Sequence, residues 1–321
     1  MSQFLAVNED DISLEDSVNA TRINGFRAKM AALLHECIDI SAVTALLSKV
    51  ESGNSFAIGA AEYNGFYACI ALSRHAFRWG VIPVVAAAQR EQLINFPPEL
   101  DLPWPYISRR YGVTSLGGNM MSNYFYNVCK GNVVYEINRK KDAHIRQAEY
   151  EFANIFATIE LKAIPVYCDM IDAVIAFERG DAASCLRHMQ SISKGISEPL
   201  KVFSETVVEH RISRTVWMPY VQGFQGWAAG EMIEGKYVEY DGLSGNQLPF
   251  FHMIDAFLGL EPYLTEENLQ RYIPEAQRDL QILFRRHSFR ARAQKRRQQQ
   301  IETEMTSIIQ RLRVGYRNDL E

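Results

Sequence analysis

Apolar side chains in this 321-residue chain recur at steps of three and four, and this spacing constrains the fold more than any other feature. The clearest stretch contains Ile145, Ala148, Phe152, Ile155, Phe156 and Ile159. Residues three and four apart share one face of an α-helix, so the stretch predicts a helix with one buried face. Pro165 is expected to interrupt it, because proline lacks the backbone donor. A second segment then runs from Val166 to Phe177 and ends at Gly180.

Further helices are predicted downstream. The apolar residues that define them are Cys185, Met189, Ile192 and Ile196, then Val202, Phe203 and Val207, then residues 250–260, and a last helix over about 289–313. Period-two alternation, which is typical of strands, is scarce. The only plausible short strands are residues 133–135 and 236–240. The fold class expected is therefore all-α.

The N-terminal third ends in a proline-rich connection, residues 95–105, which contains Pro97, Pro98, Pro103 and Pro105. Prolines at this density favour extended chain over helix. We therefore expect a domain boundary here. The expected division is a small N-terminal domain over residues 1–103 and a large domain over residues 104–321.

Composition and charge narrow the class of protein. The chain is 47% hydrophobic and carries a net charge of −4, as a globular protein does. Its longest apolar runs, residues 81–88 and 163–167, are far shorter than the roughly 18 residues of a membrane helix. Residues 1–17 are acidic and lack the basic and apolar regions of a secretory signal. Five scattered cysteines without a CxxC pair argue against a disulfide scaffold or structural zinc. We expect a cytoplasmic protein that binds neither membranes nor nucleic acid.

The common catalytic signatures are missing from the sequence. It has no P-loop, no GxGxxG after a strand, no HExxH and no GxSxG. None of the seven histidines is followed by another four residues later, the spacing at which a helix presents two metal ligands. A catalytic metal held only by protein side chains is therefore not expected.

Two local features admit a structural and a functional interpretation. Residues 285–297 contain seven arginines and lysines, which could bind nucleic acid or an acidic partner, or could simply form the solvated face of the last helix. The slightly acidic chain favours the solvated face. Residues 242–249 form a glycine-bearing polar loop, and His252 and Asp255 share a face of the next segment. A buried aspartate needs a cation or several donors.

Three stretches, taken together and in order, resemble the indoleamine 2,3-dioxygenase family, including its relative in pyrrolnitrin biosynthesis. The first, Leu102-Pro103-Trp104-Pro105-Tyr106-Ile107-Ser108-Arg109-Arg110-Tyr111-Gly112-Val113 continuing to Asn127, is similar to the pattern LPxxxVSRRLGLPP…NW. The second runs from Tyr220 through Ser244-Gly245-Asn246-Gln247 to Leu260, and the third is Arg271-Tyr272-Ile273-Pro274-Glu275-Ala276-Gln277-Arg278. The resemblance covers residues 95–321.

The resemblance implies a small N-terminal helical domain and a large helical domain that encloses heme b. It also implies an oxidoreductase whose reduced heme iron binds O₂ and which oxidises an indole ring. The expected function is a heme-dependent oxygenase, a dioxygenase-like enzyme acting on tryptophan, a substituted indole or a related aromatic amino acid, in secondary metabolism. The expected partners are a small aromatic substrate and O₂ or peroxide.

The resemblance also implies site residues. Ser244 and Gly245 would line the substrate side of the heme. Asp255 and Arg313 match a family ion pair whose arginine also meets a heme propionate. The family's carboxylate-binding arginine is replaced by Met218 here, and Arg214, one helical turn earlier, could take over anion binding.

The sequence departs from the family at the iron ligand, because Tyr316 occupies the position of the proximal histidine. Tyrosinate is a known heme ligand, and it favours ferric iron. The alternatives are that His252 or another side chain binds the iron, or that heme is lost. A tyrosinate heme would suit peroxide-driven chemistry, and loss of activity would leave a non-catalytic heme- or indole-binding protein.

Overall fold

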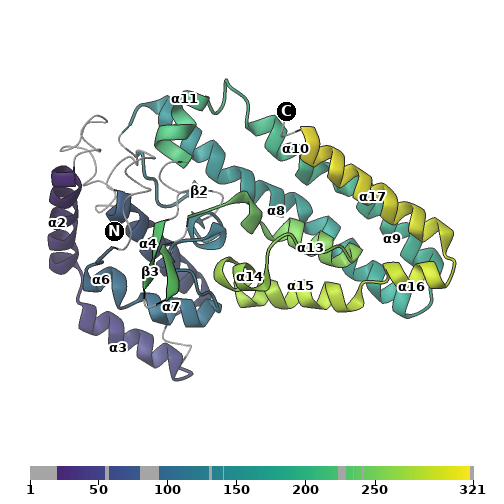
Figure 1. The fold of residues 1–321 in the computed structure, drawn as a ribbon, viewed down its shortest axis with the longest axis horizontal. Coiled ribbons are helices and arrows are strands. Elements are labelled where there is room, and N and C mark those ends of the chain that lie inside the picture. The colour runs from purple at the N-terminus through teal and green to yellow at the C-terminus, as the bar shows by residue number, and fades with distance from the viewer. Residues whose placement is uncertain are drawn as a thin grey trace. The chain divides into compact units, whose positions relative to one another are not determined.

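The computed structural model describes residues 20–54, 58–79, 94–129, 132–139, 141–222, 229–233, 235–240 and 242–318, and of these the side chains of 20–23, 79, 129, 222, 229–233, 236–240 and 314–318 are left out. The described chain is predominantly helical, which confirms the expected helical character (Figure 1). The strands in the described ranges form two separate two-stranded antiparallel hairpins.

The chain forms two compact units, each built from several segments. The first contains residues 1–153, 209–247 and 270–274, and the second contains 154–208, 248–269 and 275–321. The expected domain boundary between residues 103 and 104 falls inside the first unit, and it stays a prediction.

In the first unit, helix α4 (Ala60–Trp79) packs against α2 (Ala20–Cys37), the short α6 (Pro98–Asp101) and the π-helical turn η3 (Met121–Phe125). Helix α3 (Ile40–Glu51) packs against α7 (Trp104–Tyr111). The unit also contains α11 (Arg214–Val216), the π-helical turn η4 (Trp217–Gln222) and the 3₁₀ turn η5 (Gly245–Gln247). Tyr67, Ile70, Leu100, Trp104 and Ile107 lie in its apolar core.

The proline-rich connection is not extended, so that prediction was wrong. Pro98 and Pro105 lie in the first turns of α6 and α7, where the missing proline N–H breaks no hydrogen bond. The Arg74 guanidinium lies over the Phe96 ring at 3.9 Å and the Trp104 ring at 4.5 Å, and it donates to the Leu100 carbonyl at 2.9 Å. This buried cation holds the connection against α4.

Helix α8 (Ala143–Glu178) is continuous, so the predicted interruption at Pro165 was also wrong. A proline inside a helix leaves the carbonyl four residues earlier without its donor. Pro165 and Leu161 are both exposed, so water can satisfy the Leu161 carbonyl. The predicted apolar face is otherwise correct, since Ile145, Ile155 and Ile159 are buried.

In the second unit, helix α9 (Ala182–Gly195) packs along α17 (Gln299–Asn318), and α13 (Pro249–Leu258) packs along α15 (Glu275–His287) (Figure 1). Helix α10 (Ser197–Thr206) contacts both α9 and α17. Helix α14 (Glu266–Tyr272) passes into the first unit after Leu269. The predicted stripe on α9 is confirmed, because Cys185, Met189 and Ile192 are fully buried.

The predicted last helix is two helices, α16 (Arg290–Lys295) and α17, so the single helix was wrong. Arg297 between them has a φ of 54°, in the left-handed region. Its N–H donates to the Gln294 carbonyl and the Gln298 N–H donates to the Ala293 carbonyl, each at 3.1 Å. This is the Schellman pattern that ends a helix, formed here without glycine.

Both predicted strands exist in shortened or paired form. Strand β2 (Asn132–Val133) pairs with β1 (Val128–Cys129), and β4 (Lys236–Tyr240) pairs with β3 (Ala229–Ile233). Within the described residues, no single helix has the length and apolar character to cross a membrane, although Asn24–Cys37 and Ile40–Glu51 meet that test as a bent pair.

The described cysteines are free thiols. Cys37 in the first unit and Cys168 in the second are exposed, whereas Cys69 and Cys185 are buried.

Candidate functional site

Hydrogen bonds join the parts of the three resembling stretches that lie in the first unit. The Thr114 N–H donates to the Gln270 carbonyl at 3.1 Å, and the Ser115 N–H donates to the Arg271 carbonyl at 3.3 Å. These two bonds join the first stretch to the edge of the third. The Met120 N–H donates to Gln247 Oε1 at 3.0 Å, which joins the first stretch to the second.

The segment 115–127 lies at the centre of these contacts and is both polar and buried. Asn119, Ser122 and Asn123 have no exposed surface. Ser122 Oγ donates to Asn123 Oδ1 at 2.8 Å, and Asn119 Nδ2 donates to the Tyr67 hydroxyl at 2.9 Å. Buried amides and hydroxyls are stable only when they are bonded in this way. The η3 turn within this segment is π-helical, a conformation frequent at functional sites.

Gly118 and His75 fix the entry to η3. The Gly118 N–H donates to His75 Nε2 at 3.0 Å, so this ring nitrogen is an acceptor and the proton of the neutral ring lies on Nδ1. A Cβ atom at position 118 would collide with the Asn123 amide. Only glycine therefore allows the main chain to approach Asn123 this closely.

The predicted substrate loop is tied to this centre by Gln247. Its Nε2 donates to the Gly242 carbonyl at 3.1 Å, while its Oε1 accepts from Met120. Gln247 is 2% exposed, whereas Ser244 and Gly245 lie at the surface. The loop therefore has a buried anchor and an exposed tip.

Arg214 is the third predicted catalytic residue in the first unit. It begins helix α11, and its side chain is exposed. Its main-chain N–H donates to Glu209 Oε2 at 3.3 Å, and its guanidinium makes no ion pair with a described side chain. Helix α11 leads directly into η4.

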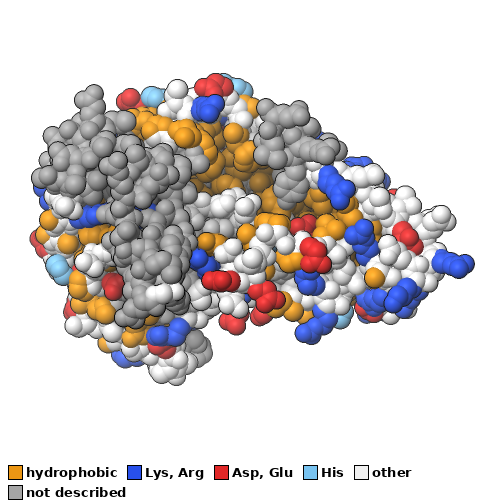
Figure 2. Space-filling view, viewed as in Figure 1, with side chains coloured by type: hydrophobic (Ala, Val, Ile, Leu, Met, Phe, Trp, Pro, Cys, Tyr) orange, Lys and Arg blue, Asp and Glu red, His pale blue; other side chains and the backbone are white. Residues whose placement is uncertain are grey.

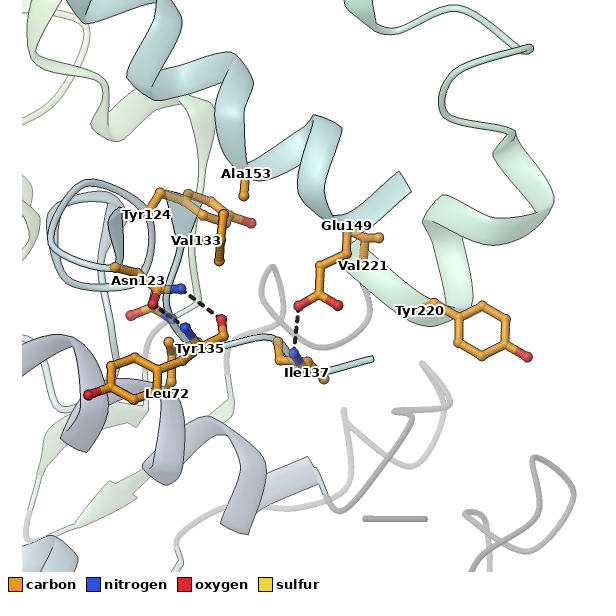
Figure 3. Close-up of a pocket in the computed structure, with 11 residues that line it drawn as sticks. Leu72, Asn123, Tyr124, Val133, Tyr135, Ile137, Glu149, Ala153, Tyr220 and Val221 are labelled. Carbon is orange, nitrogen blue, oxygen red and sulfur yellow. Dashed lines mark hydrogen bonds between the residues drawn. The ribbon is translucent and has the colours of Figure 1, made fainter. Parts of the chain in front are cut away.

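A small pocket lies beside η3 and η4 (Figure 3). The turns contribute Asn123 and Tyr124, and Tyr220 and Val221, while α8 contributes Glu149. The Tyr220 ring is directed away from the other labelled residues. The cavity volume of about 10 Å³ is room for a single water molecule and not for an aromatic substrate.

Glu149 supplies a carboxyl group to this pocket. Its carboxyl oxygens accept the Ile137 N–H at 2.6 Å and the Asn138 N–H at 2.8 Å. Burial raises its pKa from 4.5 to about 7, against the lowering effect of these hydrogen bonds. Burial also raises the pKa of Tyr124, and the Glu149 charge raises it further, so Tyr124 keeps its proton. A carboxyl group that titrates near neutral pH can act as an acid or a base.

The remaining predicted residues belong to the second unit. His252 on α13 is 1% exposed, its Nε2 lies 3.1 Å from the Tyr263 hydroxyl, and the two rings stack at 4.6 Å. Burial raises the pKa of Asp255 to about 6, and the positive charge of Arg285 opposes that shift. Because α13 packs against α15, the cation beside Asp255 is Arg285.

The predicted ion pair between Asp255 and Arg313 is not among the ion pairs of the described side chains. Arg313 lies on the exposed face of α17. Tyr316 lies in the last turn of α17, and its side chain falls outside the described residues.

The described side chains do not by themselves fit a heme site. His252 cannot bind iron through Nε2 while that atom is bonded to Tyr263. The cation beside Asp255 is Arg285, whereas the resemblance implies Arg313, which would also contact a heme propionate.

Sequence patterns did not identify the buried polar centre. Its signal is the density of serine and asparagine in Ser115–Asn127 between apolar residues, which helix and strand templates do not score. Glu149 had a weaker signal, since it follows Ala148 on the predicted buried face of α8.

Comparisons with known proteins do not extend these observations. The chain matches no protein-family model, and a search of curated proteins finds no match.

Proposed function

We propose that this protein is a heme-dependent oxygenase that acts on tryptophan, a substituted indole or a related aromatic amino acid. The observation that carries the proposal is that parts of three stretches far apart in sequence meet within the first unit. They meet through Thr114, Ser115 and Met120, which are bonded to Gln270, Arg271 and Gln247. These are the same stretches whose order along the chain resembles the indoleamine 2,3-dioxygenase family.

In this proposal, residues of the first unit bind and orient the substrate. The exposed Arg214 guanidinium would hold the carboxylate of an amino acid, because its planar fork matches two carboxylate oxygens. Ser244 and Gly245 would contact the substrate from a loop whose position is fixed by Gln247. The small cavity at Glu149 would hold water rather than substrate.

The iron ligand in this proposal is Tyr316, with His252 as the alternative. Using His252 would require the Tyr263 hydroxyl to move away from Nε2. Because His252 Nε2 is already bonded to Tyr263, a tyrosine ligand is favoured over His252. This supports a second candidate function, in which a tyrosinate heme uses peroxide rather than O₂. A protein that takes up no heme would instead be a non-catalytic binder of indoles.

The experiment that tests the proposal is the absorption spectrum of the heme-reconstituted protein, ferric and then reduced under CO. Wild type is compared with Tyr316→Phe and with His252→Ala. We expect a phenolate-type ferric spectrum that Tyr316→Phe abolishes and that His252→Ala leaves intact. A histidine-type spectrum lost only in His252→Ala would assign the ligand to His252. No heme uptake by the wild type would overturn the proposal.

Substrate binding has its own test. Replacing Arg214 with Gln removes one charge-assisted bidentate contact, which is worth about 1.5–3 kcal/mol, so KM for tryptophan should rise about 10- to 100-fold. The matched control is Arg187→Gln, an exposed arginine on α9 of the second unit. An unchanged KM in Arg214→Gln would remove Arg214 from the site, and equal activity on indole and tryptophan would show that no carboxylate is recognised.

A further inference from the structure

The part of the second unit between Asp279 and Glu302 carries a strong positive charge. Between Asp279 and Glu302 the sequence has seven arginines and lysines and no acidic residue. Removing these seven from the 34 in the chain leaves 27 against 38 acidic residues, so the rest of the chain has a net charge of −11. Figure 2 shows Lys and Arg side chains gathered over α16 and the adjoining helix ends.

Five of these seven cations make no ion pair with a described side chain, although the Arg296 guanidinium lies over the Phe177 ring at 4.9 Å. Arg292 is engaged, because it donates to both carboxylate oxygens of Glu178 at 3.0 and 2.7 Å. Arg285 donates to the Leu260 carbonyl at 3.1 Å. The five others, here called the basic corner, make no ion pair with a described side chain, and they are Arg286, Arg290, Lys295, Arg296 and Arg297.

Arg297 occupies a position that the fold alone would give to glycine. Its φ of 54° lies in the left-handed region, where a side chain with a Cβ costs roughly 1 kcal/mol or more. Glycine is the usual residue at this point of a Schellman motif. An exposed arginine is present there instead, and no described acidic side chain compensates for it. Strain retained at an exposed, charged residue points to a role outside the fold.

Aliphatic side chains lie next to the basic corner on α15. Ile282 is 52% exposed and Leu283 is 49% exposed, one turn before Arg286. Glu275 and Asp279 are exposed nearer the start of the same helix. The exposed face of α15 therefore passes from acidic to aliphatic to basic.

This order decides between classes of partner. Single-stranded nucleic acid is bound by stacking on exposed aromatic rings, and both phenylalanines of residues 275–313, Phe284 and Phe289, are buried. An anionic lipid surface would face Glu275 and Asp279 together with the arginines. Protein interfaces, in contrast, combine arginine at the contact with buried apolar anchors.

We propose that the basic corner, together with Ile282 and Leu283, is a docking surface for an acidic, leucine-containing segment of another protein. The arginines bind carboxylates, and the aliphatic pair buries apolar side chains of the partner. This surface is separate from the residues of the proposed oxygenase function and does not depend on it.

The test measures binding of fluorescent synthetic peptides to the full chain by anisotropy. One peptide contains glutamate and leucine, and the second has the same number of glutamates with serine in place of leucine. We expect the leucine peptide to bind more tightly and both to weaken as salt is raised. Ile282→Ser with Leu283→Ser should abolish the difference between the peptides. An RNA oligonucleotide or phosphatidylserine vesicles binding more tightly than either peptide would overturn the proposal.

Variants separate binding from folding. Arg297→Gly should weaken peptide binding about twofold to fivefold, the range for one exposed charge pair, while leaving the melting temperature at or above that of the wild type. Arg286→Gln, Arg290→Gln and Arg297→Gly together should weaken it at least tenfold. The matched control, Arg187→Gln, Lys194→Gln and Arg311→Gln, removes three exposed cations elsewhere in the unit. If both triple variants weakened peptide binding equally, the loss would come from the change in net charge alone, and the proposal would be overturned.

Discussion

Helix α8 carries one partly buried glutamate in each compact unit. Glu149 lies in the first unit and Glu160 in the second, about three turns further along the helix. Burial raises the pKa of each carboxyl from 4.5 to about 7. Each also accepts a main-chain N–H from a segment distant in sequence, Ile137 in one case and Phe250 in the other.

The two carboxyl groups differ in the donors whose hydrogen bonds they accept. Glu149 accepts two peptide N–H groups and lines a cavity with room for one water. Glu160 accepts one N–H from the first turn of α13 and the Tyr167 hydroxyl, at 2.7 and 2.8 Å, and so acts as a helix cap. A raised pKa alone therefore does not identify a functional carboxyl, and the cavity that Glu149 lines distinguishes it from Glu160.

The largest expected effect is on stability, when the two carboxyls are removed separately. Glu149→Ala leaves two buried peptide N–H groups without an acceptor, at a cost of about 2–6 kcal/mol in the free energy of unfolding. Glu160→Ala leaves one, so about half that loss is expected. Urea unfolding measures both. The exposed Glu261→Ala is the control and should stay within about 0.5 kcal/mol. Equal losses would remove the distinction between the two carboxyls.

The pH dependence of stability comes next in size. Both carboxyls bind protons more tightly in the folded state, with pKa values of about 7 against 4.5. The folded protein therefore holds more protons between these values, and stability falls as pH rises from about 4.5 to 7. The expected fall is on the order of 3 kcal/mol for each carboxyl. The Asp255 carboxyl, with its pKa raised to about 6, acts in the same direction.

Replacing each glutamate by glutamine in turn measures how much of the pH dependence of stability each unit contributes. Glu149→Gln and Glu160→Gln should each remove roughly one third of the pH dependence, with Asp255 contributing the remainder, as measured by urea midpoints from pH 4.5 to pH 7.5. If Glu160→Gln removed nearly all of it, Glu149 would titrate as an ordinary exposed carboxyl and could not serve the pocket.

The smallest expected effect comes from removing the tyrosine hydroxyl that donates a hydrogen bond to Glu160 and has no counterpart at Glu149. Tyr167→Phe removes a donor to Glu160 and should cost about 1 kcal/mol. Because that hydrogen bond lowers the pKa of Glu160, its loss should raise the pKa further. Carboxyl titration followed by NMR would detect this, and the Glu149 signal should not move. A shift of both signals would mean that the two groups are coupled.

The helical character was predictable, because side-chain burial on α8, α9 and α17 follows the spacing of apolar residues. The errors at Pro165 and at residues 95–105 have one cause. Sequence rules treat proline as a residue that ends helices. Inside a helix, however, the destabilisation is small when water can bond the carbonyl that lost its donor, and in a first turn the missing N–H breaks no hydrogen bond. The break at Arg297 carried no signal, since arginine is rare in the left-handed region.

The buried centre of the first unit was less predictable than the helices. Hydrogen bonds from Thr114 and Met120 to Gln270 and Gln247 join segments far apart in the chain, and no local pattern encodes such pairs. The position of Arg285 beside Asp255 was not predictable from sequence, because a charge partner is set by which helices pack, here α13 and α15, and the pair with Arg313 stays a prediction. The loop at Ser244 and the exposed Arg214 remain predictions about substrate.

Two exposed thiols among the described side chains, Cys37 and Cys168, are natural labelling positions. Maleimide dyes react with thiolate, and burial raises the pKa of Cys69 and Cys185 to about 11, which slows their reaction. Once Cys129 is replaced by serine, dyes should attach at Cys37 and Cys168, one in each compact unit. Energy transfer between a donor and an acceptor at these positions would then follow any motion of one unit against the other when heme, tryptophan or an acidic peptide is added.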